Sequence, residues 1–347
     1  MGVEDLIALF AAGALWLIDL DSKAIHTEYA SPVHEVPGGF RSAIASWNVS
    51  TDGGGWIEVA LRARVADRWT AWYQMGHWSA SLDAGHRHSI DKQSDADGRV
   101  DTDTLNLTHP ATALQLRAIV HAAPGGALPH LRLLGVAVDT GATTATAATA
   151  DVAAWGTDID VPQLTQRVGA QGGAYGGGGP SWCSATSVAM VMGYWAVRLH
   201  QPSWTIDVPT AAKGTYDPVY DGCGNWPFNV AFASEHGLRG WIQRFGSLAD
   251  VERLVASGIP VIASIKVAPG ELDGTPYPST DGHLLVIRGF TSTGDVIVND
   301  PDGKPGGIRI VYKRDQFFHV WQHGSNGAVY LIAPPALLAM PARTSAG

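Results

Sequence analysis

The chain has 347 residues, of which 46% are hydrophobic and 16% are charged, a composition typical of a well-packed globular protein. Its net charge of −9 reflects 32 acidic against 23 basic residues. No basic run of the kind that binds phosphate backbones occurs, so we expect no nucleic-acid partner. The length exceeds what a single hydrophobic core usually serves, and we expect two domains.

The first residues lack the pattern of a secretory signal. Glu4 and Asp5 stand where a signal peptide carries basic residues, and no clear cleavage site follows. The apolar run over residues 6–18 is interrupted by Gly13 and is too short to span a bilayer. We therefore expect no signal peptide and no membrane span in the chain as given, and leave open an extracellular or a cytoplasmic location.

Alternation of apolar and polar residues predicts a first domain built of strands, over residues 9–138. In residues 56–65 the side chains of Ile57 and Val59 fall on one face and that of Glu58 on the other. Residues 114–120 repeat the alternation, and glycine-rich turns separate such runs. We expect an all-β domain, a β-sandwich of jelly-roll type with a possible binding role.

Composition then divides the chain. Residues 139–159 are rich in Ala and Thr without any period, which indicates a linker. Helices followed by strands predict an α+β domain over residues 160–335, with a C-terminal tail at 336–347. The expected elements are helices at 184–195, 229–236 and 248–256 and strands at 261–267, 284–290, 296–299, 308–312 and 328–332.

Cys183 directly precedes the first of these predicted helices and so stands at its N-terminus. Unpaired amides and the positive end of the helix dipole favour a thiolate at that position, which is the form that acts as a nucleophile. The other cysteine, Cys223, stands between two glycines and is interpreted as a small packed residue. With two cysteines in the chain, we expect no disulfide framework.

A base and its orienting group follow in the same domain. His283, preceded by Gly282, opens one predicted strand, and Asp300 closes the next strand of the hairpin. Counting along this hairpin puts Asp300 opposite about Val286, so contact with His283 requires strand twist and closure of the following loop. Asn299 is the alternative orienting residue, because an amide also orients an imidazole.

These residues lie within segments that resemble a known family. The segments are Gln166, Trp182-Cys183-Ser184-Ala185-Thr186-Ser187, Gly224-Asn225-Trp226-Pro227-Phe228-Asn229, Gly282-His283 and Asn299-Asp300-Pro301. Together they resemble the free-standing bacterial relatives of the bacteriocin-leader-processing cysteine peptidases, family thirty-nine of the papain-like clan. The resemblance spans about residues 160–334. Residues 46–48 and 100–104 resemble the β domain that often precedes such peptidases.

The resemblance implies a papain-like fold and a set of catalytic roles. Cys183 would be the nucleophile, His283 the general base and Asp300 its orienting partner. The family also carries an upstream glutamine that donates to the oxyanion, for which Gln166 fits best. Because the glycine-rich stretch before the cysteine is long, Gln171 is an alternative. No cofactor is implied.

Aromatic residues suggest an extended peptide as substrate. Tyr175, Trp182, Trp226 and Tyr277 surround the predicted site. We assign substrate binding to five residues, Trp182, Tyr175, Trp226, Asn225 and Gly282. A wall-linked peptide or another amide fits equally, and the oligomeric state is not predicted.

Two functions remain open from the sequence. The first is a cysteine hydrolase, a peptidase that cleaves a peptide or amide bond through a thioester on Cys183. The second is a non-catalytic protein that binds carbohydrate or cell wall, a hypothesis motivated by the 13 tryptophans. The acidic turn over residues 95–103 lacks calcium-loop spacing, and His86 and His88 have no second pair at zinc spacing, so we expect no metal.

Overall fold

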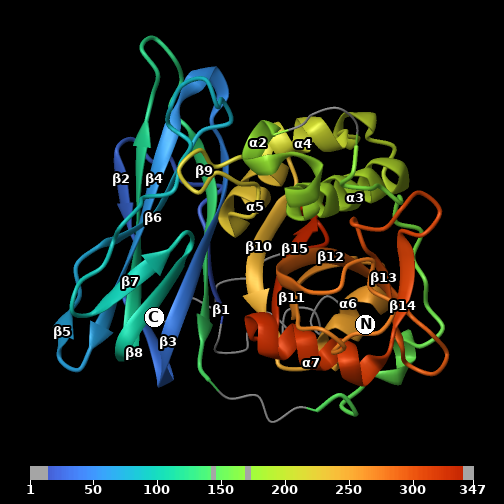
Figure 1. The fold of residues 1–347 in the computed structure, drawn as a ribbon. Coiled ribbons are helices and arrows are strands. Elements are labelled where there is room, and N and C mark those ends of the chain that lie inside the picture. Colours follow the sequence, from blue (N-terminus) through green and yellow to red (C-terminus); the bar gives the residue numbers. More distant parts are fainter. Residues whose placement is uncertain (1–14, 142–145, 169–172, 339–347) are drawn as a thin grey trace.

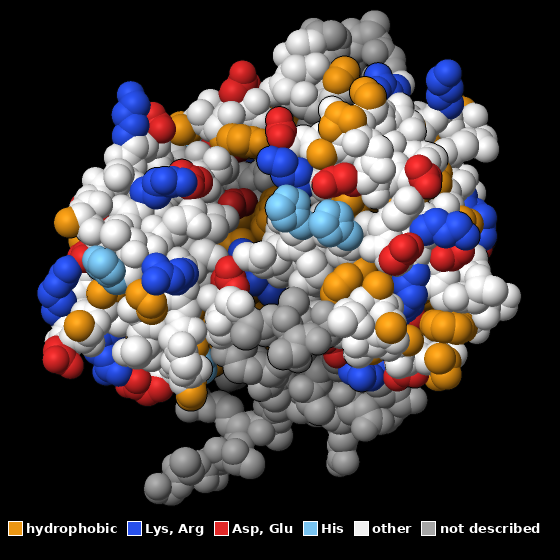
Figure 2. Space-filling model, turned by 60° about the horizontal axis from the view of Figure 1, so that its bottom comes forward, with side chains coloured by type: hydrophobic (Ala, Val, Ile, Leu, Met, Phe, Trp, Pro, Cys, Tyr) orange, Lys and Arg blue, Asp and Glu red, His pale blue; other side chains and the backbone are white. Residues whose placement is uncertain are grey.

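The structure, a computed structural model, describes residues 15–141, 146–168 and 173–338. In Figure 1 a strand-rich part, coloured blue to green, stands beside a mixed part of helices and strands, coloured green to red. Most of the apolar run at residues 6–18, Gln171 and residues 339–347 of the predicted tail lie outside the described residues. Acidic and basic side chains are interspersed over the face shown in Figure 2.

The first part of the chain forms an antiparallel sheet of nine described strands. The strands are β1 (Leu15–Asp19), β2 (Glu28–Ala30), β3 (His34–Ser50), β4 (Trp56–Val65), β5 (Arg68–Trp69), β6 (Tyr73–Trp78), β7 (Gly98–Asp101), β8 (Thr104–His121) and β9 (His130–Asp139), with a short 3-10 turn, η1 (Asp52–Gly54). Their order is β1-β9-β3-β8-β4-β5, while β2 and β7 pair with β8 and β6 pairs with β4.

The jelly-roll type is not confirmed by this topology. Strand β8 pairs with β3 and β7 within residues 104–114 and with β4 and β2 within residues 111–121, so the described strands form one continuous sheet. Irregular pairing in β3 around Phe40, next to Gly38 and Gly39 at positive φ, lets this long strand bend. The sheet-rich character of the first domain is as predicted.

The second part is an α+β domain. Its helices are α2 (Ala174–Gly177), α3 (Cys183–Arg198), α4 (Val208–Thr215), α5 (Trp226–Glu235), α6 (Leu248–Ala256) and α7 (Arg314–Ser325), with 3-10 turns η2 (Val152–Ala154), η3 (Gly179–Ser181) and η4 (Pro202–Trp204). Its strands are β10 (Arg239–Arg244), β11 (Val261–Val267), β12 (Thr280–Phe290), β13 (Val296–Asn299), β14 (Arg309–Tyr312) and β15 (Ala328–Ala333), ordered β10-β15-β11-β12-β13-β14. Helices α3 and α5 precede most of the sheet and pack against it.

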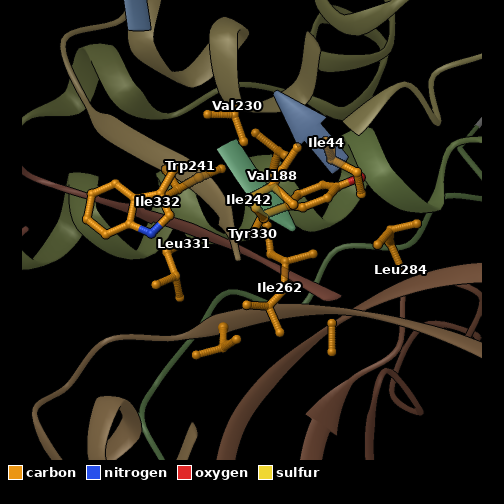
Figure 3. Close-up of a cluster of buried hydrophobic side chains, with 14 of the residues drawn as sticks. Ile44, Val188, Val230, Trp241, Ile242, Ile262, Leu284, Tyr330, Leu331 and Ile332 are labelled. Carbon is orange, nitrogen blue, oxygen red and sulfur yellow. The ribbon is translucent and has the colours of Figure 1, made fainter. Parts of the chain in front are cut away.

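The two domains share a hydrophobic core. Figure 3 shows Ile44 of β3 in one buried cluster with Val188 of α3 and with side chains of β10, β11 and β15. The Asn48 amide donates to the carbonyl of Gly240 at 2.7 Å and accepts from its N–H at 3.1 Å. One side chain of the first domain therefore satisfies both main-chain groups of a residue in β10.

Polar contacts strengthen this interface. The carboxylate of Glu235, a partly buried residue at the end of α5, accepts hydrogen bonds from Trp78 Nε1 at 2.9 Å and from the N–H and hydroxyl of Thr51 at 3.0 and 2.8 Å. Burial raises the pKa of Glu235, and these donors oppose that rise. Because breaking these partly buried bonds leaves the carboxylate without partners, we expect the two domains to keep a fixed relative position.

The segment that sequence analysis assigns to a linker lies on the second domain where it is described. Glu252 of α6 accepts from the N–H of Asp151 at 2.6 Å and from Trp155 Nε1 at 2.8 Å. The boundaries of the two domains and of the linker stay predictions. Within the described ranges, no helix has the length and apolar character that crossing a membrane requires.

Candidate active site

Cys183 and His283 line the same cleft, which has a volume of about 590 Å³. One wall comes from the start of α3 and the loop before α5, and the other from β11, β12 and the loop before β12. Further lining residues include Gln166, Trp226, Tyr277 and Gly282. Segments far apart in the sequence therefore meet at one open site.

Cys183 is the first residue of α3 and is a partly exposed free cysteine. The residue before it, Trp182, makes no side-chain cap to the helix. Main-chain amides of a first helical turn have no intrahelical partner, so the sulfur stands at the positive end of a helix of 16 residues. This environment favours the thiolate form of a cysteine.

The His283 imidazole joins the cysteine to a buried carboxylate. Its Nε2 donates to Asp300 Oδ1 at 2.7 Å, and only 5% of the residue is exposed. Burial alone would lower the pKa of His283, but the charge and hydrogen bond of Asp300 and a hydrogen bond with Cys183 outweigh it and raise the pKa to about 10. With Nε2 held by Asp300, Nδ1 is the ring nitrogen left for the sulfur.

Both carboxylate oxygens of Asp300 accept hydrogen bonds. Besides His283, its Oδ1 accepts from the N–H of Asp302 at 3.0 Å, while Oδ2 accepts from the hydroxyls of Tyr277 at 3.1 Å and Tyr312 at 3.0 Å. Burial alone would raise the pKa of Asp300, but the histidine and these donors lower it below its ordinary value. The carboxylate therefore stays charged although it is fully buried.

The sequence does not predict that Tyr277 and Tyr312 donate hydrogen bonds to Asp300. Tyr277 is one of the aromatic residues expected around the site. Its ring centroid lies 4.8 Å from that of His283, so it covers the histidine as well as holding Asp300. Tyr312 was missed, because nothing in the alternating pattern of β14 marks it as a donor to a carboxylate. Burial and the nearby negative charge raise the pKa of both tyrosines, so they remain protonated donors.

Asn299, the alternative orienting residue, bonds elsewhere. Its Nδ2 donates to the carbonyls of Val161 at 3.0 Å and Pro162 at 3.1 Å, and its Oδ1 accepts from Arg288 at 3.2 Å. These bonds fasten the start of the second domain to β13. The contact with the histidine is made by Asp300.

Gln166 lines the same cleft as Cys183, with 2% of its surface exposed. Its main-chain N–H donates to the carbonyl of Pro301 at 2.8 Å, and its Nε2 donates to the carbonyl of Pro180 at 2.9 Å. The second hydrogen of the same amide nitrogen remains for a ligand in the cleft. The alternative donor, Gln171, lies outside the described residues.

The five residues assigned to substrate binding fall into two groups. Trp226 and Gly282 line the cleft. Trp182 is fully buried and donates from Nε1 to the carbonyl of Tyr175, and neither side chain is among the residues that line the cleft. Asn225 is also buried and caps α5, since its Oδ1 accepts a main-chain N–H of that helix at 3.3 Å.

The second cysteine, Cys223, differs chemically from the first. It is a free, buried thiol among the residues that line the cleft, and its Sγ donates to the carbonyl of Ala212 at 3.3 Å. Burial raises the pKa of this thiol to about 12, so at neutral pH it is protonated. A protonated, packed thiol is a poor nucleophile.

The acidic turn of the first domain has protein partners. Asp97 pairs with Arg68 and Asp101 with Arg99, while Asp103 accepts at 2.7 Å from the first main-chain N–H of α5. Throughout the part of the chain that the structure describes, no group of three or more His, Cys, Asp or Glu side chains is placed to hold a metal.

Comparison with protein families accounts for most of the chain. Residues 24–139 match the model of the peptidase C39 N-terminal domain, and residues 158–329 match that of the peptidase C39-like family. The chain belongs to the C39-like peptidase family. This C39-like peptidase is therefore a cysteine peptidase, and its substrate is a peptide or protein. The search of curated proteins found no match.

Solved structures similar to this C39-like peptidase are distant. A protein described as a C39-like peptidase, from Bacillus anthracis, is 16% identical, covers 50% of this chain and 96% of its own, and has a TM-score of 0.35. Xylellain, a cysteine protease from Xylella fastidiosa, is 11% identical, covers 54% of this chain and 93% of its own, and has a TM-score of 0.28. The family assignment rests on the family models.

Proposed function

We propose that this peptidase hydrolyses peptide bonds with Cys183 as nucleophile, His283 as general acid and base and Asp300 as the orienting residue. The observation that supports this most directly is the 2.7 Å bond between His283 and Asp300, in a cleft that Cys183 also lines. One ring nitrogen is fixed by the carboxylate, and the other is available to the sulfur. The imidazole is thereby held in one orientation.

The reaction follows from these positions. The thiolate of Cys183 attacks the scissile carbonyl carbon and forms a C–S bond. Protonated His283 then gives its proton to the leaving nitrogen as the C–N bond breaks, which leaves a thioester. A water molecule next attacks the thioester carbon and loses a proton to His283. The C–S bond breaks, the acid leaves, and the thiolate is restored beside the protonated histidine.

Gln166 is the proposed oxyanion donor. Its side-chain nitrogen keeps one hydrogen for the cleft, and the main-chain N–H of Cys183 lies in the unpaired first turn of α3. Two such donors, held in place before reaction, stabilise the negative charge that develops on the carbonyl oxygen. The bond from Gln166 to the carbonyl of Pro180 fixes the amide plane.

The substrate class that the cleft supports is an extended peptide. Trp226 and Gly282 line the cleft, so a peptide can lie over the indole while its main chain passes a residue without a side chain. A peptide attached to cell wall belongs to the same class, and the first domain would then bring the peptidase to that surface. The non-catalytic hypothesis is not retained, because the chain belongs to a peptidase family and its Cys183 and His283 share one cleft.

The test is cleavage of a peptide mixture by the purified full chain, read by mass spectrometry of new termini. Cys183→Ala should abolish cleavage and leave the thermal unfolding midpoint within a few degrees of that of the unchanged chain. Cys223→Ala is the matched control, because it removes the other thiol and should keep catalysis. Cleavage that survives Cys183→Ala would overturn the proposal.

A further inference from the structure

A second cavity, of about 390 Å³, lies between the two domains. The first domain contributes residues of β3, β8 and β9, and the second contributes the starts or ends of α5, β10 and α7. The lining includes Arg41 and Asp139 from the first domain and Trp226, Arg244 and Gly324 from the second. The face in Figure 2 is hollowed near its centre, with acidic and basic side chains around the hollow.

This interdomain cavity adjoins the active-site cleft. Trp226 and Gly324 line both, so the indole forms the wall between the two spaces. Asp103 of the first domain accepts from the main-chain N–H of Trp226 at 2.7 Å and so fixes the start of α5. A peptide that extends past Trp226 from the cleft therefore meets side chains of the first domain.

The charge inside the cavity is not balanced by the protein. Neither Arg41 nor Arg244 forms an ion pair with any residue that the structure describes. Arg244 donates to the carbonyl of Ser325, but its Nε is buried with no partner. A buried guanidinium donor without an acceptor is costly, and a carboxylate is the acceptor that guanidinium groups bind best.

The one carboxylate that lines the cavity is already engaged. Asp139 accepts from Asn326 Nδ2 at 2.7 Å through one oxygen and from the N–H of Gly141 at 2.8 Å through the other. Burial lowers the pKa of Arg244, as expected for a cation that lacks a close counter-ion, although the more distant Asp139 partly opposes this. The site therefore has guanidinium donors to offer to a ligand, and its one carboxylate is already hydrogen-bonded.

We propose that this interdomain cavity is a specificity subsite, in which Arg244 and Arg41 bind an acidic side chain of the peptide substrate. This proposal rests on the proposed function, since it extends the same cleft. The first domain then has a direct part in substrate choice, because it supplies Arg41 and, through Asp103, holds the indole wall. Recognition is by a carboxylate, which distinguishes Glu or Asp from Gln or Asn at one position of the peptide.

The experiment measures binding separately from cleavage. Peptides of one length carry a single Glu moved through each position in turn, and a matched set carries Gln instead. Affinity is measured by fluorescence anisotropy with the Cys183→Ala chain, and kcat/KM is measured with the unchanged chain. At one position, Glu should bind about tenfold tighter or more than Gln, and the preference should weaken with added salt.

Substitution then locates the preference. R244Q and R41Q should each reduce the Glu-to-Gln ratio several-fold, while the affinity for the Gln peptide changes little. R41Q alters an exposed side chain and carries the test if R244Q does not fold. The matched control is R64Q, an arginine of the same domain that pairs with Glu35 outside the cavity and should leave the ratio unchanged.

The outcomes separate the two proposals. Cleavage with no Glu preference at any position, or a preference that both substitutions leave intact, overturns the subsite alone. A Glu preference in binding, with no cleavage by the unchanged chain, supports the subsite and overturns the hydrolytic function.

Discussion

The ring of His283 bonds to Asp300 although the two residues are not paired in their hairpin. In the register of β12 and β13, Asn299 lies opposite Val286, so Asp300 is still two residues short of the histidine. Asp300 closes that gap because it follows the last residue of β13 and its N–H bonds to the carbonyl of Ile308. The side chain is then free to turn towards β12, where it meets Nε2 at 2.7 Å.

The first prediction concerns Asp300→Asn. Without the carboxylate, burial lowers the pKa of His283 from its raised value of about 10, so the imidazolium is lost at a lower pH. We expect kcat to fall by about 100- to 10,000-fold and the alkaline limb of kcat/KM to move to lower pH. The measurement is a pH profile of peptide cleavage.

Asn299→Ala is the control for this substitution. It breaks the bonds to Val161 and Pro162, so the free energy of unfolding should fall by about 1–3 kcal/mol. The pH limb should stay in place. If the alkaline limb moved with Asn299→Ala and not with Asp300→Asn, the orienting residue would be Asn299 and the assignment to Asp300 would be wrong.

The second prediction concerns Gln166→Ala. Because the amide is proposed to stabilise the oxyanion and not the bound peptide, kcat should fall by roughly 100- to 1000-fold with little change in KM. Steady-state kinetics on one peptide substrate measures the split. Gln163→Ala, an exposed glutamine of the same segment, is the control and should behave like the unchanged chain. A rise in KM at unchanged kcat would mean that Gln166 only binds substrate.

The third prediction concerns Asp103 and stability against pH. Burial raises the pKa of Asp103 to about 6, although the N–H of Trp226 and the hydroxyl of Thr104 oppose the rise. Between about pH 4 and pH 6, the folded chain therefore keeps a proton on Asp103 that the unfolded chain has released. The contribution of protonated Asp103 to the free energy of unfolding is lost as the pH rises through this range.

Asp103→Asn removes this dependence, and its side-chain oxygen can still accept from Trp226. Relative to the unchanged chain, the variant should gain about 2 kcal/mol of unfolding free energy between pH 4 and pH 7. Urea denaturation at several pH values measures the difference. If the unfolding free energies of the two chains changed with pH in the same way across this range, the pKa of Asp103 would not be raised in the folded chain.

Local patterns were sufficient to predict much of the second domain. The helix starting near Cys183 and the strands Val261–Val267 and Val296–Asn299 follow from short-range periodicity, and the structure has them. The hairpin register was predicted to within one residue, because a short turn joins two clearly apolar strands. Helix α7 was missed, since it carries buried residues at only a few of its positions.

Side-chain direction was harder to predict than position along the chain. Trp182 directly precedes Cys183, but its indole turns into the core because the chain enters α3 there. The order Asn225-Trp226-Pro227 has the N-cap and early proline of a helix start. That signal separates the buried cap residue from the partly exposed indole that follows it. Contacts between domains, such as Asn48 with Gly240, leave no local signal at all.

The most direct test of the account is the rate of alkylation of the two thiols by iodoacetamide near pH 6, mapped by mass spectrometry in the same molecules. We predict rapid modification of Cys183, slow modification of Cys223, whose pKa is raised to about 12, and a large loss of the Cys183 rate in His283→Ala. Equal, slow modification of both thiols, or a Cys183 rate that His283→Ala leaves unchanged, would contradict a cysteine activated by that histidine.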